Sequence, residues 1–304
     1  MKKTTNHGTC EGDDVYVPTP RDGDTWPSAF RGVIASLKVV PGKAVVCSPE
    51  GQTALVPLNR LRKPSFAVTG EGDDGYICMD DYPVAQRTDF LERLADMVVT
   101  GVAPSLIVAG DPGIGKTFTV MERIRLAVKE AELTVIKGKV SPMGLYRALY
   151  FSNGKLIVFD DADSVFDDKD SVALLKAALD SYDKRIVSWH SPSAVAEGLP
   201  TDFLFTGRAI FITNRDITRL DEAVLDRSFR INITMNNDEV LERLSHIYTQ
   251  MEKKVDVAIR KEVLDYLVAT SDRLAKISFR TMINAIRLRT SSPDKWQEMV
   301  PLFA

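Results

Sequence analysis

The stretch Ser105-Leu-Ile-Val-Ala-Gly110-Asp-Pro-Gly-Ile-Gly115-Lys116-Thr117 decides the fold of this 304-residue chain. Its first half is a short apolar run typical of a buried strand. Its second half matches G-x-x-x-x-G-K-[ST] in full, directly before a helical pattern in residues 118–131. Such a loop surrounds phosphates with backbone N–H groups, because its glycines let it wrap closely and the next helix points its N-terminus at the anion. We therefore predict a nucleotide site made of Gly110, Asp111, Pro112, Gly113, Ile114, Gly115, Lys116, Thr117 and Phe118.

Within that site, two side chains have distinct expected roles. Lys116 is expected to bridge the β- and γ-phosphates, and the Thr117 hydroxyl to ligate Mg²⁺. The motif therefore predicts ATP or ADP with Mg²⁺ as the cofactors.

In a second motif, the four apolar residues 156–159 run into Asp160 and Asp161, and Asp160 lies 43 positions after Thr117. This pattern places a carboxylate at the carboxyl tip of a buried strand, where Asp160 can hold Mg²⁺ through its water shell. Asp161 is then placed to orient or deprotonate an attacking water. Many strands end in aspartate, so the pattern gains its meaning only from the phosphate loop before it. Together the two motifs predict an ATPase.

Strand-like and helix-like segments alternate around these motifs. Strands are expected at 105–110, 133–138, 155–161 and 208–214, and helices at 87–99, 118–131, 143–151 and 171–181. Alternation of this kind predicts an α/β core with a doubly wound parallel sheet, which we assign to residues 85–235. Residues 236–304 show only helical patterns, at 238–252, 257–270 and 278–289, and are expected to form a helical lid subdomain.

Residues 14–63 have a different pattern, with short β-like runs separated by Pro/Gly turns about every 8 to 12 residues. This spacing predicts a small SH3-like β-barrel, preceded by a disordered tail in residues 1–13. Residues 64–84 contain glycines and acids and are expected to be a linker. The end of the predicted barrel is basic, and this is either a docking surface or a solvated face; it consists of Arg60, Arg62 and Lys63.

The overall composition excludes several classes of protein. A formal net charge of −3 gives no whole-protein basic field, although it leaves room for a local basic groove that binds nucleic acid. The three cysteines and three histidines are scattered, unlike a disulfide framework or a zinc motif. No run of 18 apolar residues occurs, so no membrane partner is expected, and the first ten residues do not resemble a secretory signal. We therefore expect a cytoplasmic protein, in a bacterial host if it is encoded by a phage.

The order of motifs over residues 85–290 resembles the AAA+ ATPases, particularly phage-encoded ones. The resemblance implies a homo-oligomer, commonly a hexameric ring, that binds nucleotide between core and lid. Residues 209–214 resemble the sensor 1 strand, which implies that Asn214 contacts the γ-phosphate or the water. Arg280 resembles sensor 2 and would touch the γ-phosphate of its own subunit, or else is a solvated helical arginine.

Residues 220–230 resemble the family's arginine-finger region. The resemblance implies that Arg227, or alternatively Arg230, reaches the nucleotide of a neighbouring subunit. Either arginine could instead cap the helix end or pair with a local acid. The chain departs from the family at Asp161, a position where AAA+ ATPases usually have glutamate. The shorter side chain would lie farther from the water, which predicts slower hydrolysis or a compensating adjustment of the site.

Two segments are candidates for gripping a client. Lys137 and Lys139 could meet phosphates, and Met143 stands near the tip of what resembles a pore loop; alternatively this is a solvated loop. Residues 184–207 predict a hairpin that resembles the one before sensor 1 in helicase-like AAA+ proteins. Its Trp189 and His190 could stack on a base or grip a peptide, or Trp189 packs on the helix at 174–179.

Three functions stay open on the sequence. The first is a ring-type motor that remodels or translocates nucleic acid, and the second is a protein-remodelling chaperone with the barrel as client adaptor. The third is an ATP-gated assembly scaffold or loader with slow hydrolysis.

The sequence also hints that residues 82–84 border the adenine.

Overall fold

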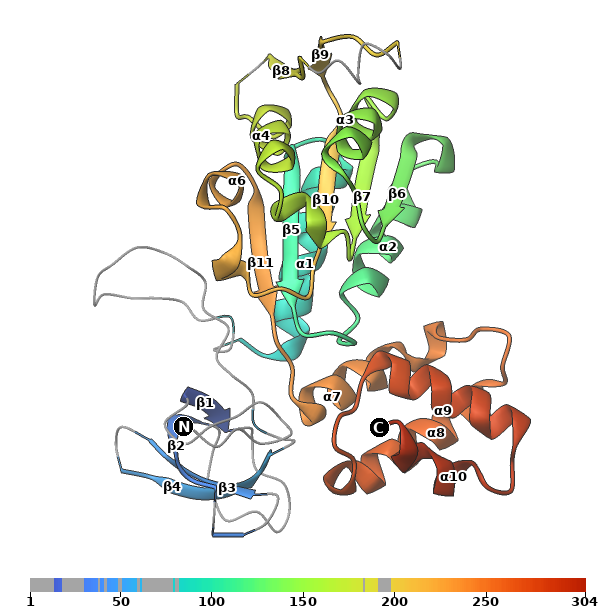
Figure 1. Ribbon diagram of the computed structural model, residues 1–304. Coiled ribbons are helices and arrows are strands. Elements are labelled where there is room, and N and C mark those ends of the chain that lie inside the picture. Colours follow the sequence, from blue (N-terminus) through green and yellow to red (C-terminus); the bar gives the residue numbers. More distant parts are fainter. Residues whose placement is uncertain are drawn as a thin grey trace.

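We describe the protein from a computed structural model, in which residues 14–17, 30–37, 39–40, 43–48, 51–58, 61, 79, 82–182, 184–190 and 198–304 are described (Figure 1). The predicted tail at 1–13, the basic group Arg60, Arg62 and Lys63, and most of the predicted linker lie outside these residues.

The core is a parallel sheet of five strands in the order β11-β5-β10-β7-β6. These strands span Phe229–Ile233, Ser105–Gly110, Arg208–Ile212, Leu156–Asp160 and Leu133–Lys137. The chain leaves β5 for the far edge at β6 and later passes from β10 to β11 on the other side of β5. Adjacent strands β5 and β10 therefore form the switch point of the sheet, where ligands bind outside the carboxyl ends of the strands.

Helices cover both faces of this sheet, as the alternation of apolar side chains along each strand requires. Leu106 and Val108 of β5 face one core cluster, which includes residues of α1 (Val84–Val99) and α2 (Lys116–Ala127). Ile107 and Ala109 face the other cluster, shared with α3 (Pro142–Phe151), α4 (Lys169–Ala178) and α6 (Glu222–Asp226). The predicted doubly wound α/β class is confirmed.

The predicted secondary structure needs two local corrections. Helix α2 ends at Ala127 rather than near residue 131, because Val128 takes up an extended backbone that leads toward β6. The hairpin predicted at 184–207 is present, but its paired strands are short, with β8 (Arg185–Ser188) antiparallel to β9 (Asp202–Phe205).

Beyond β11 the chain is helical, with α7 (Asn237–Ile247), α8 (Val257–Thr270), α9 (Phe279–Ser291) and the short α10 (Trp296–Met299). Because β11 is parallel to β5 and leads into α7, this helical part starts at the carboxyl edge of the sheet. In Figure 1 it is the orange and red group. None of the described helices is long and apolar enough to cross a membrane.

The N-terminal part is a four-stranded antiparallel sheet in the order β1-β2-β3-β4. Its strands are Asp14–Val17, Phe30–Ser36, Lys43–Cys47 and Thr53–Pro57. The described residues contain no pairing of β1 with β4 that would close the sheet. An all-β N-terminal part is confirmed, whereas the SH3-like barrel stays a prediction.

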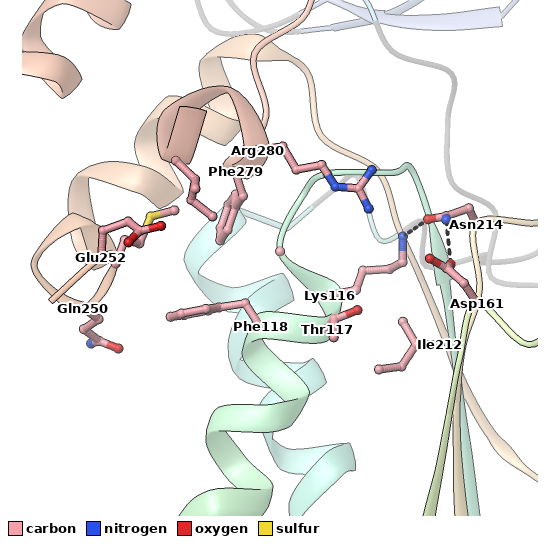
Figure 2. A pocket seen from close by; sticks show the side chains of 14 residues that line it. Lys116, Thr117, Phe118, Asp161, Ile212, Asn214, Gln250, Glu252, Phe279 and Arg280 are labelled. Carbon is pink, nitrogen blue, oxygen red and sulfur yellow. Dashed lines mark hydrogen bonds between the residues drawn. The ribbon is translucent and has the colours of Figure 1, made fainter. Parts of the chain in front are cut away.

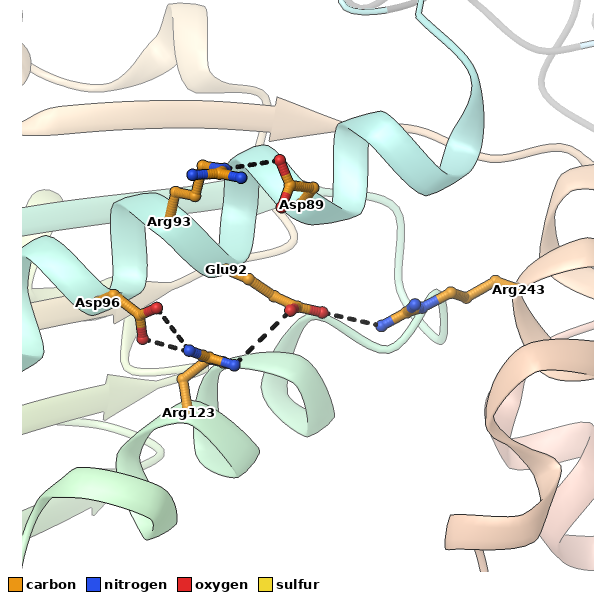
Figure 3. A network of polar contacts seen from close by, with 6 residues as sticks. All are labelled: Asp89, Glu92, Arg93, Asp96, Arg123 and Arg243. Atoms are coloured by element: carbon orange, nitrogen blue, oxygen red, sulfur yellow. Dashed lines mark hydrogen bonds and ion pairs between the residues drawn. The ribbon is translucent and has the colours of Figure 1, made fainter.

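Ion pairs join the helical part to the core. Arg87 of α1 is almost fully buried, donates to the carbonyl of Thr234 at 2.8 Å and pairs with Glu239 of α7. Nearby, Glu92 of α1 accepts from Arg243 of α7 at 3.4 Å and lies 3.8 Å from Arg123 of α2 (Figure 3). These contacts make α1 the support on which α7, the first helix of the helical part, rests.

Replacing Arg87 should therefore loosen the helical part. We expect Arg87→Ala to lower the free energy of unfolding by about 3–5 kcal/mol, because it leaves Glu239 without its buried cation. Urea unfolding followed by circular dichroism measures the loss. The matched control is Arg93→Ala on the same helix, which removes an exposed pair with Asp89 and should have no measurable effect. Equal effects of the two variants would contradict the assigned role of Arg87.

Candidate functional site

The phosphate-loop motif lies between β5 and α2, at the switch point of the sheet. Gly115 precedes α2 with a φ of 90°, in the left-handed region that favours glycine. A Cβ on Gly115 would come within 2.3 Å of the Phe279 ring, and one on Gly113 within 2.7 Å of the Ser278 Cβ. The backbone N–H of Phe279 also donates to the Gly113 carbonyl at 2.7 Å. The glycines thus let the loop pack closely against the start of α9, which holds the loop in place.

Lys116 is buried at the start of α2, and its ammonium makes three hydrogen bonds. It donates to the carbonyls of Gly110 and Asp111 and to the Asn214 Oδ1, at 2.8, 2.7 and 2.8 Å. Burial lowers the pKa of Lys116 to about 8, against the opposing pull of nearby aspartates. These three acceptors hold the Lys116 ammonium beside the loop, where it could meet the oxygens of a phosphate.

Asn214 connects this lysine to the second motif. It follows β10, and its Nδ2 donates to the Asp161 Oδ1 at 2.8 Å while its Oδ1 accepts from Lys116. Asp161 has a φ of 54°, and its N–H donates to the carbonyl of Ile212 in β10 at 3.0 Å. Three loops that follow β5, β10 and β7 are therefore joined by one chain of hydrogen bonds, Lys116–Asn214–Asp161, which Figure 2 shows.

Asp160, the last residue of β7, is the predicted metal carboxylate. Thr117 Oγ1 donates to its Oδ1 at 2.8 Å, and Lys137 Nζ lies 2.7 Å from its Oδ2. A hydroxyl and a carboxylate in contact are the hard oxygen donors that suit a largely hydrated Mg²⁺. Thr117 and Asp160 therefore fit the metal, and the glycine cradle fits the phosphates.

A cavity of about 320 Å³ opens beside the loop, between the core and the helical part (Figure 2). One end has the polar groups Lys116, Thr117, Asp161 and Asn214. The opposite end is more apolar, where the rings of Phe118 and Phe279 meet edge-on with centroids 6.0 Å apart. Met251 and Ile283 also line the cavity, together with the polar side chains of Gln250 and Glu252. A polar end for phosphates and an apolar end for a base is the division that a nucleotide requires.

Sequence reasoning missed the apolar end. Phe279 stood next to the predicted Arg280, but nothing local in the sequence marked Gln250, Met251 or Glu252 as cavity residues. Residues 82–84, which were expected to border the adenine, do not line the described cavity. The Tyr82 ring instead lies against Phe90, with centroids 5.1 Å apart.

The three predicted arginines take different positions. Arg280 lines the cavity from the first turn of α9 and extends toward the phosphate loop in Figure 2. Arg227 is half-buried at the end of α6, and its Nη1 donates to the Ala223 carbonyl at 2.9 Å, which is the helix-end contact considered as its alternative. Arg230 is exposed on β11, the edge strand of the sheet. The finger assignment stays a prediction, because it requires a second subunit.

The predicted client-gripping residues do not come together. Lys137 and Lys139 lie at the carboxyl edge of the sheet, where β6 ends, whereas Trp189 and His190 follow β8 in the hairpin that precedes the amino end of β10. Met143 lies in α3, partly buried against a core cluster.

Trp189 is also partly buried, against Tyr146 of α3 with centroids 5.6 Å apart, and belongs to the packing around the cluster that includes α4. Among the five, Lys137, Lys139 and His190 are exposed.

Comparison with known proteins finds one similar sequence of phage origin. An uncharacterized 36.7 kDa protein from the nrdC-mobD intergenic region of Enterobacteria phage T4 is 29% identical over 237 residues, which are 71% of this chain and 73% of that protein. No protein-family model matches the sequence.

Solved structures show remote similarities. NtrX from Brucella abortus, in complex with ADP, is 12% identical with a TM-score of 0.44; the match covers 69% of this chain but only about half, 51%, of NtrX. Two variants of RuvB from Thermotoga maritima have TM-scores of 0.39 and 0.41 at 14% and 12% identity. They cover 76% and 71% of this chain and 76% and 67% of RuvB. The functional interpretation therefore depends on the site itself.

The close approach of the loop to α9 can be tested with two glycines of similar φ. Gly115→Ala should lower the free energy of unfolding by about 1–3 kcal/mol more than Gly138→Ala, because only the first methyl group meets the Phe279 ring. Gly138, with a φ of 81° and open space around it, reports the backbone strain alone. Urea unfolding measures both. Equal losses would mean that the loop and α9 do not pack as described.

The lowered pKa of Lys116 predicts a pH dependence of stability in the absence of nucleotide. Between pH 8 and the ordinary pKa of 10.5, the unfolded chain keeps a proton that the folded chain has released, so the free energy of unfolding rises with pH. Lys116→Met lacks this contribution. We expect the stability of the wild type relative to that variant to increase from pH 7 to pH 10 in urea titrations, and a constant difference would show that the lysine is not desolvated.

Proposed function

We propose that this chain is a Mg²⁺-dependent ATPase of the AAA+ type that acts as a homo-oligomer. The observation that carries the proposal is the hydrogen-bonded chain Lys116–Asn214–Asp161, which lies beside the Thr117–Asp160 pair at the mouth of a cavity with an apolar end. A cation for phosphates, an oxygen pair for a metal and a carboxylate for a water are the groups that phosphoryl transfer to water needs. The T4 relative supports a phage origin for the chain.

In this mechanism the loop N–H groups and Lys116 bind the β- and γ-phosphates, and Thr117 and Asp160 hold the metal. When bound, Mg²⁺ neutralises charge that develops on the phosphate oxygens. A water forms a bond to the γ-phosphorus in line with the β–γ bridging oxygen, whose bond breaks, and the proton of the water passes toward the Asp161 carboxylate. Asn214 orients Asp161, and Arg280 stabilises the γ-phosphate from the lid.

The short Asp161 side chain fits this role through its backbone. Its left-handed φ of 54° and the hydrogen bond from its N–H to Ile212 give the residue a conformation different from that of the preceding strand. We propose that this turn compensates for the methylene that Asp161 lacks relative to glutamate.

We further propose that an arginine from a neighbouring subunit completes the site. Arg227 is the first candidate and Arg230 the second. For Arg227 this requires that its guanidinium leave the Ala223 carbonyl on assembly, a contact whose loss costs about 1 kcal/mol.

For the client we propose nucleic acid, with remodelling or translocation as the output. Lys139 in the loop after β6 and His190 in the hairpin after β8 are exposed groups that suit phosphates and bases. A competing observation favours a protein client. Ile186 and Leu204 are cross-strand partners on the hairpin, and both are about half exposed, at 53% and 48%. An exposed apolar pair of this kind is suited to an unfolded peptide.

Steady-state ATP hydrolysis across protein concentration tests the enzyme. We expect turnover per subunit to rise with concentration, Lys116→Ala to abolish it, and Asp161→Asn to lower it by about 10²–10⁴ while nucleotide still binds. A chain that binds ATP with no turnover under any condition would contradict the role of Asp161 and favour the assembly scaffold. A chain that does not bind nucleotide would contradict the whole proposal.

Mixed oligomers test the arginine. Arg227→Ala and Arg230→Ala should each be assayed alone and mixed with inactive Lys116→Ala subunits. The variant that lacks the true finger should lose about 10³-fold or more in turnover and regain activity only in the mixture. No regain for either variant would exclude a finger in trans.

Client-stimulated turnover separates the two clients. Stimulation by single- or double-stranded DNA supports nucleic acid, whereas stimulation by an unfolded protein, lost in Ile186→Ser, supports a protein client.

A further inference from the structure

Lys137 is the one predicted client-gripping residue whose charged end the structure places at the nucleotide site. It is the last residue of β6 and pairs in register with Asp160 of β7. Its Nζ lies 2.7 Å from the Asp160 Oδ2, the oxygen that Thr117 does not contact. Asp160 thus has one partner for each oxygen, a hydroxyl on one and an ammonium on the other.

The environment of this pair is asymmetric. The Asp160 side chain is only 8% exposed, so its negative charge needs a partner, whereas the Lys137 side chain is 67% exposed and can reach water by rotation of its own side chain. Leaving the pair is therefore inexpensive for Lys137, but Asp160 must receive another cation in exchange.

The incoming cation is the metal of the proposed function, on which this inference rests. An ammonium at 2.7 Å from a carboxylate oxygen occupies the space in which a hydrated Mg²⁺ would meet the same carboxylate. Two cations side by side in a poorly solvated site repel each other. We propose that Lys137 is a tethered counter-ion that positions Asp160 when no metal is bound and is displaced from it when Mg²⁺–nucleotide binds.

The adjoining loop is built to limit such a displacement to its first residues. Gly138 is exposed and has a φ of 81°, and a Cβ added there would meet nothing within 4 Å, so the side-chain position after Lys137 faces open space. Val140 is fixed, because its N–H donates to the Ser164 Oγ at 2.8 Å and its carbonyl accepts from the same hydroxyl at 3.0 Å. Ser164 lies in the 3-10 turn just after β7. Release of Lys137 therefore changes the charge that the loop 137–139 presents to solvent, while its far end stays anchored.

Metal affinity without turnover tests the inference. The protein is saturated with a β,γ-imido analogue of ATP, and Mn²⁺ is titrated in while free Mn²⁺ is followed by electron paramagnetic resonance. Because Lys137 competes with the metal, Lys137→Met should bind Mn²⁺ about three- to tenfold more tightly than the wild type, which is the range expected for loss of a partly exposed ion pair. Lys137→Arg keeps a cation at the same place and should behave like the wild type.

Lys139→Met is the matched control, because Lys139 is an exposed lysine of the same loop with no ion pair to Asp160 among the contacts described. It should leave Mn²⁺ affinity unchanged. A second readout is thermal unfolding without nucleotide or metal, in which Lys137→Met should be less stable than the wild type because Asp160 loses its cation.

Unchanged or weaker Mn²⁺ binding in Lys137→Met would overturn the inference, and so would an equal gain in Lys139→Met. Neither result would touch the proposed ATPase, which fails instead if wild-type protein does not bind the analogue or if Mn²⁺ does not bind to the complex. The lysine variants thus test the inference, whereas the wild-type protein tests the proposed ATPase.

Discussion

The two hydrogen bonds of the Asn214 amide hold the candidate site together. A neutral amide can accept from an ammonium and donate to a carboxylate at the same time, so Asn214 joins Lys116 to Asp161 at 2.8 Å on each side. A carboxylate in its place would attract the lysine but repel Asp161. An apolar residue would remove one of the three acceptors of Lys116 and the amide donor to Asp161. These hydrogen bonds fix the segments that follow β5, β10 and β7 relative to one another. They can form because the three strands are neighbours in the sheet.

The charges around this amide form a balanced set. Lys116 has three oxygen partners, and the Asp160 carboxylate has Thr117 and Lys137. Such balance matters because an unpaired charge in a poorly solvated site is costly. Under the proposed function, a nucleotide and its metal would therefore bind by exchange of partners, and the affinity for each would reflect the contact that it replaces.

The helical part contributes to the site through the place at which it docks on the core. Its first helix, α7, is fixed to α1 through the buried pair of Arg87 with Glu239, and the start of α9 contacts the phosphate loop through Phe279 and Ser278. These contacts close one side of the cavity and place Arg280 over the loop. Any movement of the helical part therefore changes both the more apolar end of the cavity and the distance of Arg280 from the phosphate loop.

The sequence by itself determined the local features. The phosphate loop, the strand that ends in Asp160 and the α/β alternation depend on residues close together in the chain, because periodicity and glycine placement act over a few residues. Tertiary structure alone decided what depends on distant segments meeting: the partner of Lys137, the packing of Trp189 on Tyr146, and the cavity lining that includes Phe118, Met251 and Phe279. Lys137 is predicted at the end of the strand 133–138 and the start of a candidate pore loop, and nothing in its neighbourhood shows that β6 pairs with β7. Strand order and the docking of the helical part, which no local pattern encodes, bring these groups together.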